Sequence, residues 1–97
     1  MSTYIMLANW TDQGVRSAKD TVKRARAFRE AGSAMGITVA TLNWTLGPYD
    51  LVLTFESPDD ETTTRVGLAL AAQGNVRTVT MRAFGEEEME RIVSGLK

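Results

Sequence analysis

The chain has 97 residues, of which 43% are hydrophobic and 24% are charged, and this predicts one globular domain over residues 1–97. Eleven basic and twelve acidic side chains give a net charge of -1, which disfavours nucleic acid or an anionic membrane as partners. The sequence contains neither cysteine nor histidine, so disulfides, thiolate chemistry and histidine ligation of metals or haem are excluded.

The first element predicted along the chain is a strand over residues 3–10, TYIMLANW, which is rich in β-forming residues and precedes a polar turn. Both faces of this strand are apolar for most of its length, as expected for a strand that is covered twice. A short turn of helix within residues 14–20 leads into a helix over residues 21–35, where apolar residues recur at three- and four-residue steps. Thr21 is its expected N-cap, and Gly36 ends it.

Two strands are predicted next, over residues 37–45 and 50–56. The connection between them is short and contains Gly and Pro, which favours an antiparallel hairpin. A second long helix follows, with Ser57 as its expected N-cap and Pro58 at its first position.

The last two elements are a strand over residues 75–84 and an amphipathic helix that begins near Glu86. The complete order is strand, helix, strand, strand, helix, strand and an added C-terminal helix, which contains the ferredoxin-like βαββαβ order. The sequence therefore predicts an α+β fold with a four-stranded antiparallel sheet and two helices on one face. The other face must be solvated, occupied by a ligand or buried against another subunit.

Side-chain alternation assigns residues to the two faces, because neighbouring residues of a strand point to opposite sides. The positions expected to face the helices are Ile5, Leu7, Val79, Met81 and Ala83. The positions left on the open face are Tyr4, Met6, Ala8, Trp10, Thr78, Thr80 and Arg82. An open face that combines apolar and polar side chains favours two copies packed sheet to sheet, as a homodimeric α/β barrel that encloses two pockets.

Three short runs in the sequence resemble the GYD domain family: ANWTDQG at 8–14, LGPYD at 46–50 and GNVRT at 74–78. The likeness covers nearly the whole chain, including SPDD at 57–60 and RAF at 82–84. The resemblance implies the dimeric α/β-barrel architecture, while the biochemical role of the family is largely undefined. More distant members of that superfamily include cofactor-free monooxygenases, haem-dependent chlorite-degrading enzymes and ligand-sensing domains, so fold alone does not decide function.

The LGPYD turn and the strand ends near it carry most of the candidate site residues. Tyr49 and Asp50 fit either ordinary turn chemistry, in which the acid caps the backbone, or a pair of polar groups at a pocket mouth. Asn9 is the best polar candidate, because an amide inside a strand must be hydrogen-bonded when it is buried. The candidate ligand-binding residues are Asn9, Trp10, Trp44, Tyr49, Asp50, Thr80 and Arg82.

Three of these candidates also have a purely structural interpretation. Trp10 and Trp44 fit a small hydrophobic core as well as they fit ligand contact. Arg82, if it lies on the open face, needs either a ligand anion or an ion pair with Asp50 or Glu56.

Clusters of charge on the predicted helices are interpreted as solvated or capping groups. The basic residues of the long helix region are Lys19, Lys23, Arg24, Arg26 and Arg29, and no interleaved aromatic residues accompany them as they do in nucleic-acid sites. The three glutamates at 86–88 complement a helix N-terminus. Neither a metal site nor a cofactor is predicted, because no ligand spacing for either is present.

The favoured function is a small-molecule binding or sensing module that forms a homodimer or higher homo-oligomer. A cofactor-free monooxygenase acting on a small aromatic or polyketide-like substrate is the first alternative, because such chemistry needs hydrogen-bond donors and confinement more than a nucleophile. A structural assembly subunit is the second alternative. No signal-peptide pattern or membrane-length apolar run is present, so a cytoplasmic location is expected.

Overall fold

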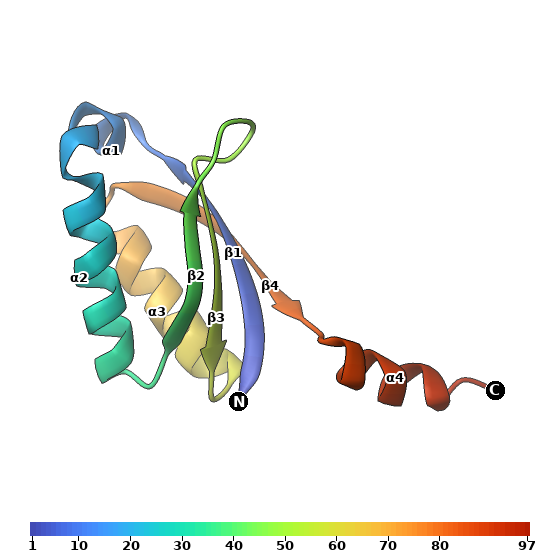
Figure 1. Ribbon diagram of the computed structural model, residues 1–97. Helices are drawn as coiled ribbons and strands as arrows, with labels where there is room; N and C mark the ends of the chain where they lie inside the picture. Colours follow the sequence, from blue (N-terminus) through green and yellow to red (C-terminus); the bar gives the residue numbers. More distant parts are fainter.

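The computed structural model describes residues 1–97 and confirms the predicted α+β fold (Figure 1). The strands are β1 (Ser2–Trp10), β2 (Thr38–Trp44), β3 (Leu51–Ser57) and β4 (Val76–Ala83). The helices are α1 (Asp12–Arg16), α2 (Thr21–Ala34), α3 (Asp60–Ala72) and α4 (Glu86–Ser94), with a 3₁₀ turn at Ala18–Asp20. No helix combines the length and the hydropathy that a membrane span requires.

The four strands form one antiparallel sheet in the order β2-β3-β1-β4, which is the ferredoxin-like arrangement. Helices α2 and α3 lie on one side of this sheet, and the opposite side is left open (Figure 1). The added helix α4 continues from the end of β4 and extends away from the body of the domain on the open side. The sheet and the helices α2 and α3 therefore form a body of two layers, and α4 lies outside it.

Two predicted helix starts differ from the structure by one or two residues. Asp20 is the N-cap of α2, and Thr21 is instead its first residue, where its hydroxyl accepts a hydrogen bond from the indole of Trp44 at 3.0 Å. Ser57 pairs with Ser2 as the last residue of β3, so α3 begins later than predicted. Asp59 caps α3 by accepting the backbone N–H of Thr62 at 2.7 Å.

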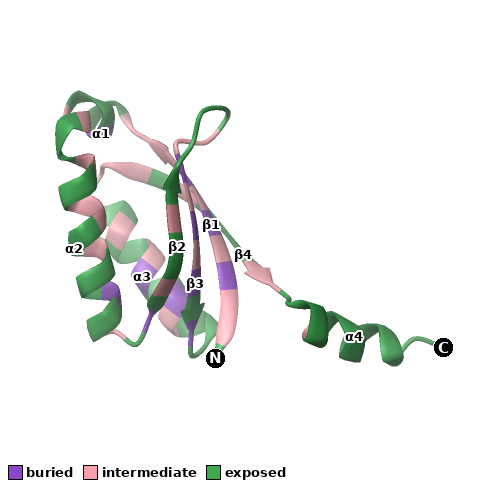
Figure 2. Ribbon diagram, viewed as in Figure 1, coloured by how far each residue is buried: buried purple, intermediate pink, exposed green.

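The hydrophobic core lies between the sheet and the two covering helices, where the buried residues of β1, β3 and α3 gather (Figure 2). Its buried members are Tyr4, Met6, Ile37, Leu53, Phe55 and Val66. The rings of Tyr4 and Phe55 stack with centroids 5.5 Å apart. The Tyr4 hydroxyl donates to the carboxylate of Asp60 at the start of α3, and this bond together with burial raises the pKa of Tyr4. The core therefore contains one satisfied polar group that joins β1 to α3.

The predicted assignment of the two sheet faces is wrong. Tyr4, Met6 and Ala8 are buried under the helices, opposite the β3 residues of the same face. The open face carries the positions that were expected to be covered: Ile5, Leu7, Val79, Met81 and Ala83. The polarity of β4 misleads because β4 is an edge strand, and its helix-facing residues line an open polar groove beside α3 rather than the closed core. Those residues, Thr78, Thr80 and Arg82, keep access to solvent although they face the helical layer.

Gly14, in α1, packs directly against the backbone at the start of β4. A Cβ added at Gly14 would lie 2.0 Å from the carbonyl oxygen of Asn75, which is far inside van der Waals contact. Because that neighbour is backbone, it cannot move aside without disturbing β4. The close approach therefore requires glycine.

We expect Gly14→Ala to lower the free energy of unfolding by at least about 1–3 kcal/mol, the usual cost of overpacking. Gly67→Ala in α3 is the matched control, because its added Cβ meets no atom within 4 Å and alanine favours a helix over glycine by about 1 kcal/mol. Urea unfolding of both variants measures the difference. Equal loss of stability in the two variants would contradict the packing argument.

Candidate functional site

Two of the three sequence motifs are joined at the end of β1. The backbone N–H of Trp10 donates to the Asp50 carboxylate at 3.0 Å, and the backbone N–H of Asp50 donates to the carbonyl of Ala8 at 2.9 Å. Across the turn, the Thr45 hydroxyl donates to the carbonyl of Tyr49 at 2.6 Å. Hydrogen bonds to main-chain groups of β1 therefore hold the LGPYD turn in place, and the carboxylate of Asp50 accepts one of them.

The third motif, at the start of β4, is bound to the turn that follows β1. The backbone N–H of Thr11 donates to the carbonyl of Asn75 at 3.0 Å, and the Thr11 hydroxyl donates to the carbonyl of Gly74. The side-chain amide of Gln13 donates to the Asn75 side-chain oxygen at 3.0 Å. All three motifs thus meet in one joint at this end of the sheet, which we call the motif joint and which comprises residues 8–14, 46–50 and 74–78.

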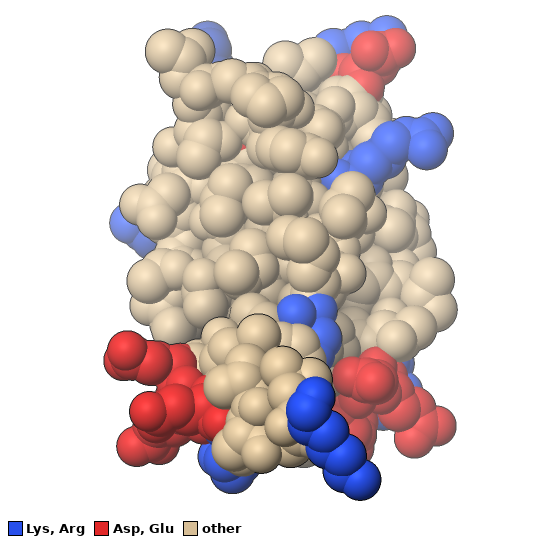
Figure 3. Space-filling view, turned by 90° about the vertical axis from the view of Figure 1, so that its right-hand side faces the viewer, with Lys and Arg blue, Asp and Glu red and all other residues tan.

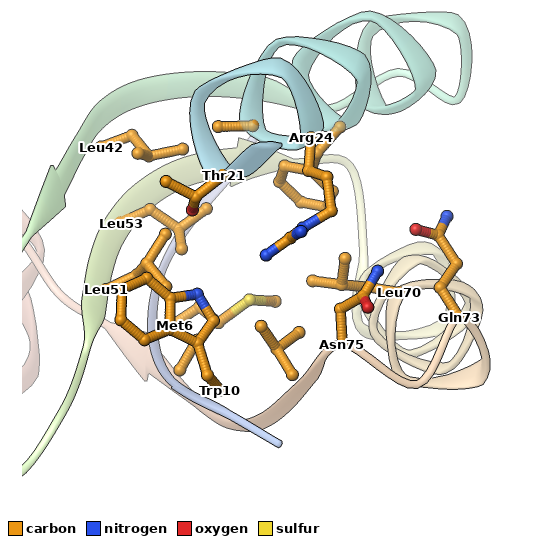
Figure 4. Close-up of a pocket in the computed structure, with 14 residues that line it drawn as sticks. Met6, Trp10, Thr21, Arg24, Leu42, Leu51, Leu53, Leu70, Gln73 and Asn75 are labelled. Carbon is orange, nitrogen blue, oxygen red and sulfur yellow. The ribbon is translucent and has the colours of Figure 1, made fainter. Parts of the chain in front are cut away.

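A cavity of about 60 Å³ lies beside the motif joint, between the sheet and the helices (Figure 4). Most of its lining is apolar and comes from Met6, Ala8, Ala25, Phe28, Leu42, Leu51, Leu53, Leu70 and Val76. Its polar lining comes from Trp10, Thr21, Arg24, Gln73 and Asn75. Figure 4 shows the Arg24 guanidinium reaching from α2 into this space, toward the side of Trp10 and Asn75.

Arg24 brings a positive charge to the cavity without a negative partner. One of its terminal nitrogens donates to the carbonyl of Ser17 at 2.8 Å and to the Ser17 hydroxyl at 3.0 Å, and the other donates to the carbonyl of Gly14 at 3.2 Å. All these acceptors are neutral, and the chain has a single ion pair, between Arg82 and Glu88. The half-buried charge of Arg24 is therefore solvated by dipoles and not compensated by a carboxylate.

The role of Arg24 was missed because the basic residues of α2 were interpreted together as one solvated face. Helical spacing separates Arg24 from the others, since Thr21, Arg24 and Phe28 are three and four residues apart and share the inner side of the helix. Arg26 and Arg29, in contrast, are exposed. If each basic residue of α2 had been assigned to a helix face with a period of 3.6 residues, Arg24 would have been placed on the inner side.

The structure does not bring the seven candidate residues together. Trp10 lines the cavity, while Trp44 lies on a separate shallow surface of α2 and β2. Thr80 and Arg82 line the polar groove between β4 and α3. Asn9 is on the open face, because its neighbours Ala8 and Trp10 point to the helical side. Tyr49 and Asp50 lie in the turn of the motif joint. A pocket shared by all seven is therefore not present within one chain.

Arg82 has a different ion-pair partner from the two that were predicted. Its guanidinium lies 2.8 Å from the Glu88 carboxylate in the first turn of α4, and neither Asp50 nor Glu56 is involved. The same guanidinium lies over the ring of Phe84, 4.6 Å from the centroid. The hydrogen bond from Arg82, followed by that from the backbone N–H of Gly85, lowers the pKa of Glu88. These contacts hold the start of α4 to the end of β4.

The open face of the sheet presents a largely uncharged surface. Figure 3 shows this face, with α4 projecting toward the viewer. Its apolar centre consists of Ile5, Leu7, Val52, Val79 and Met81. Its two charged members, Glu56 and Arg77, lie near strand ends. The apolar side of α4 is also exposed and consists of Met89, Ile92 and Val93, and the exposed Leu96 follows just beyond the end of the helix. Polar residues surround the apolar centre of the sheet, among them Asn9, Asn43 and Thr54, so the exposed apolar patch of the open face is confined to β1, β3 and β4.

Comparison with known proteins identifies the family. The sequence profile of the GYD domain matches residues 4–93. The chain belongs to the GYD domain family. This GYD domain is also similar to a Thermus thermophilus protein named "Glutamine synthetase and cystathionine beta-lyase binding protein". The two sequences are 36% identical over 88 residues, which cover 87% of the GYD domain described here and 90% of the relative. The predicted family is confirmed, and the motifs that indicated it are those that build the motif joint.

The role of Asp50 in this GYD domain can be measured as stability. We expect Asp50→Ala to lower the free energy of unfolding by about 1–3 kcal/mol, because it leaves the partly buried N–H of Trp10 without its acceptor. Asp50→Asn keeps an acceptor oxygen and is expected to lose less. Tyr49→Phe is the control, because the Tyr49 hydroxyl forms no hydrogen bond within the chain. Urea unfolding that shows no difference between Asp50→Ala and Tyr49→Phe would mean that the Asp50 carboxylate does not hold the turn.

The Arg82–Glu88 pair predicts a pH-dependent attachment of α4. Because the folded-state pKa of Glu88 is lowered, its stabilisation is complete above the ordinary glutamate value of about 4.3 and is lost as pH falls through the folded value. We expect backbone amides of α4 to exchange hydrogen faster in Glu88→Gln than in the native protein at pH 7, by a small factor because both groups are partly exposed. Glu87→Gln, at the exposed neighbouring position, removes a charge from the same first turn but no ion pair, so we expect it to speed exchange less. The same exchange rate in both variants would remove the ion pair as the attachment.

Proposed function

We propose that this GYD domain is a protein-binding module that pairs with a second copy of itself through the open face of its sheet. The observation that carries the proposal is the uncharged apolar centre of that face, residues Ile5, Leu7, Val52, Val79 and Met81. In an antiparallel sheet with one solvated face, alternate residues are normally polar on the wet side. In this sheet the central residues are apolar on both faces, so the open face is better suited to burial against another protein than to contact with water.

The modest core of the isolated chain supports the same proposal. Only 12 of the 97 residues are buried, and the open face contributes none of them to the core cluster. Two sheets packed face to face bury their inner side chains in a layer about 10 Å thick. A second copy supplies a matching surface by symmetry, because each copy presents the same patch to the other.

Helix α4 gives the pairing a further contact. It has nine residues, and an isolated helix of fewer than about 12–15 residues is marginal in water. Its apolar side has no counterpart in its own chain, and it projects on the side of the open face (Figures 1 and 2). In a face-to-face pair, the apolar side of α4 would pack against the facing copy.

Binding of other proteins is the second part of the proposed function. The relative from Thermus thermophilus is named for binding glutamine synthetase and cystathionine β-lyase, and the two chains align over most of their lengths. We infer that the paired GYD domain binds metabolic enzymes of this kind. A cytoplasmic location, expected from the sequence, agrees with such partners and stays a prediction.

The corrected faces weaken the proposal of a ligand pocket between two sheets. Trp10, Thr80 and Arg82 point to the helical side, so a space between two open faces would be lined by Asn9 and mainly apolar residues. The cofactor-free monooxygenase alternative needs several hydrogen-bond donors around its substrate. We therefore favour protein binding over catalysis for the open face.

A charge placed on the open face tests self-association. We expect Val79→Glu, at a position that is 51% exposed in the single chain, to shift the protein to a monomer in sedimentation equilibrium at micromolar concentration. Leu68→Glu is the matched control, because Leu68 is 66% exposed on α3 and away from the open face. A native protein that is monomeric at these concentrations, or equal behaviour of the two variants, would overturn pairing through this face.

Enzyme binding is tested separately with purified partners. The glutamine synthetase and the cystathionine β-lyase of the organism that encodes this chain would be immobilised and titrated with the GYD domain by surface plasmon resonance. Saturable binding to either enzyme, reduced by unlabelled GYD domain as competitor, is the expected result. Failure to bind both enzymes would remove this part of the proposal and leave self-association standing.

A further inference from the structure

We infer that the cavity beside the motif joint is a binding site for a small amphiphilic carboxylate, with its head group at Arg24 and its apolar part between α2 and α3. This inference does not depend on the open face or on the protein partners proposed above. It starts from the half-buried charge of Arg24, which faces an apolar cavity and has no carboxylate partner in the chain.

The cavity offers hydrogen-bond donors that the protein leaves free. A guanidinium has five N–H donors, and Arg24 uses three of them on Ser17 and Gly14, so two remain. The indole N–H of Trp10 forms no hydrogen bond within the chain, although Trp10 lines the same space. The side-chain oxygen of Asn75 accepts from Gln13, which fixes the amide and leaves its NH₂ group as a donor.

The charge of the lining selects the class of head group. Arg24 is the one charged residue among the 14 that line the cavity, and no acidic side chain is present there. Planar carboxylates match the fork geometry of a guanidinium. A single cation and a cavity of about 60 Å³ fit a monocarboxylate, and they do not fit a nucleotide or another polyanion.

The apolar part of the ligand has its own place next to the cavity. A groove of about 240 Å³ runs between α2 and α3 and shares Arg24, Phe28, Leu70 and Gln73 with the cavity. Small side chains along the groove leave room between the helices, and these are Ala27, Ala31, Gly32 and Ala69. The groove ends on the apolar side chains of Met35 and Val66. Cavity and groove together approach the roughly 300 Å³ at which small-molecule pockets begin.

The arrangement therefore resembles a two-part site, with polar donors at the motif joint and an apolar channel leading away from it. A fatty or aryl monocarboxylate satisfies both parts at once, because its charge compensates Arg24 and its tail covers core side chains that are now accessible from the groove. A neutral molecule of the same shape satisfies only the apolar part, which gives the experiment its contrast.

The test uses octanoate, with octan-1-ol as the neutral probe of similar length. Trp44→Phe leaves Trp10 as the single tryptophan, so Trp10 fluorescence reports directly on the cavity. We expect a saturable change on titration with sodium octanoate at pH 7, and binding of octan-1-ol that is at least about tenfold weaker. Equal affinity for the two probes, or no saturable change with octanoate, would overturn the carboxylate site.

Variants in the same background locate the head group. Asn75→Asp puts a negative charge into the cavity while keeping the acceptor for Gln13, and we expect it to weaken octanoate binding by about tenfold or more. Arg24→Gln is expected to do the same, and Arg26→Gln, exposed on the same helix, is the matched control with unchanged affinity. Because Arg24 also binds Ser17 and Gly14, Asn75→Asp keeps the test decisive if Arg24→Gln does not fold. Unchanged octanoate affinity in Asn75→Asp would contradict the inferred position.

Discussion

The hydrogen bond from the backbone of Trp10 to the Asp50 carboxylate sets the point at which β1 leaves the sheet. Immediately beyond it, Thr11 binds the start of β4 and caps α1 through the N–H of Gly14 at 3.1 Å. Helix α1 and the following turn then offer carbonyls to Arg24, which positions the first half of α2 over the sheet. The position of the helical layer, and the cavity beneath it, therefore depend on the end of one strand.

The second constraint is that two helices can cover only one face of a four-stranded sheet. The covered face takes the large side chains of β1 and β3, and the open face keeps a smaller apolar set for which the chain itself has no partner. Helix α4 cannot repair this, because it points away from the sheet and exposes its own apolar side. Binding of another protein is thus the simplest way to cover the apolar surfaces of the open face and of α4.

Element order, and most element boundaries to within one or two residues, followed from periodicity and turn residues in the sequence. Faces could not be assigned in the same way, because β1 is apolar on both sides and β4, the strand used to decide, is an edge strand whose polar residues reach solvent beside α3. Arg82 shows the same limit, since its partner Glu88 comes from a helix whose direction no local pattern specifies. Asp50 and Trp10 were predicted as ligand-binding residues, which stays a prediction. The structure joins them by a hydrogen bond from the backbone of Trp10, which no side-chain pattern in the sequence specifies.

The distance between two open faces tests the central claim most directly. The chain contains no cysteine, so a single nitroxide can be placed at Thr54→Cys on the open face or at Glu30→Cys, an exposed position on the outer surface of α2. Facing sheets lie about 10 Å apart, so pulsed electron paramagnetic resonance should give a short distance between copies for the Thr54 label and a much longer one for the Glu30 label. No dipolar coupling at Thr54, or a shorter distance at Glu30, would contradict pairing through the open face.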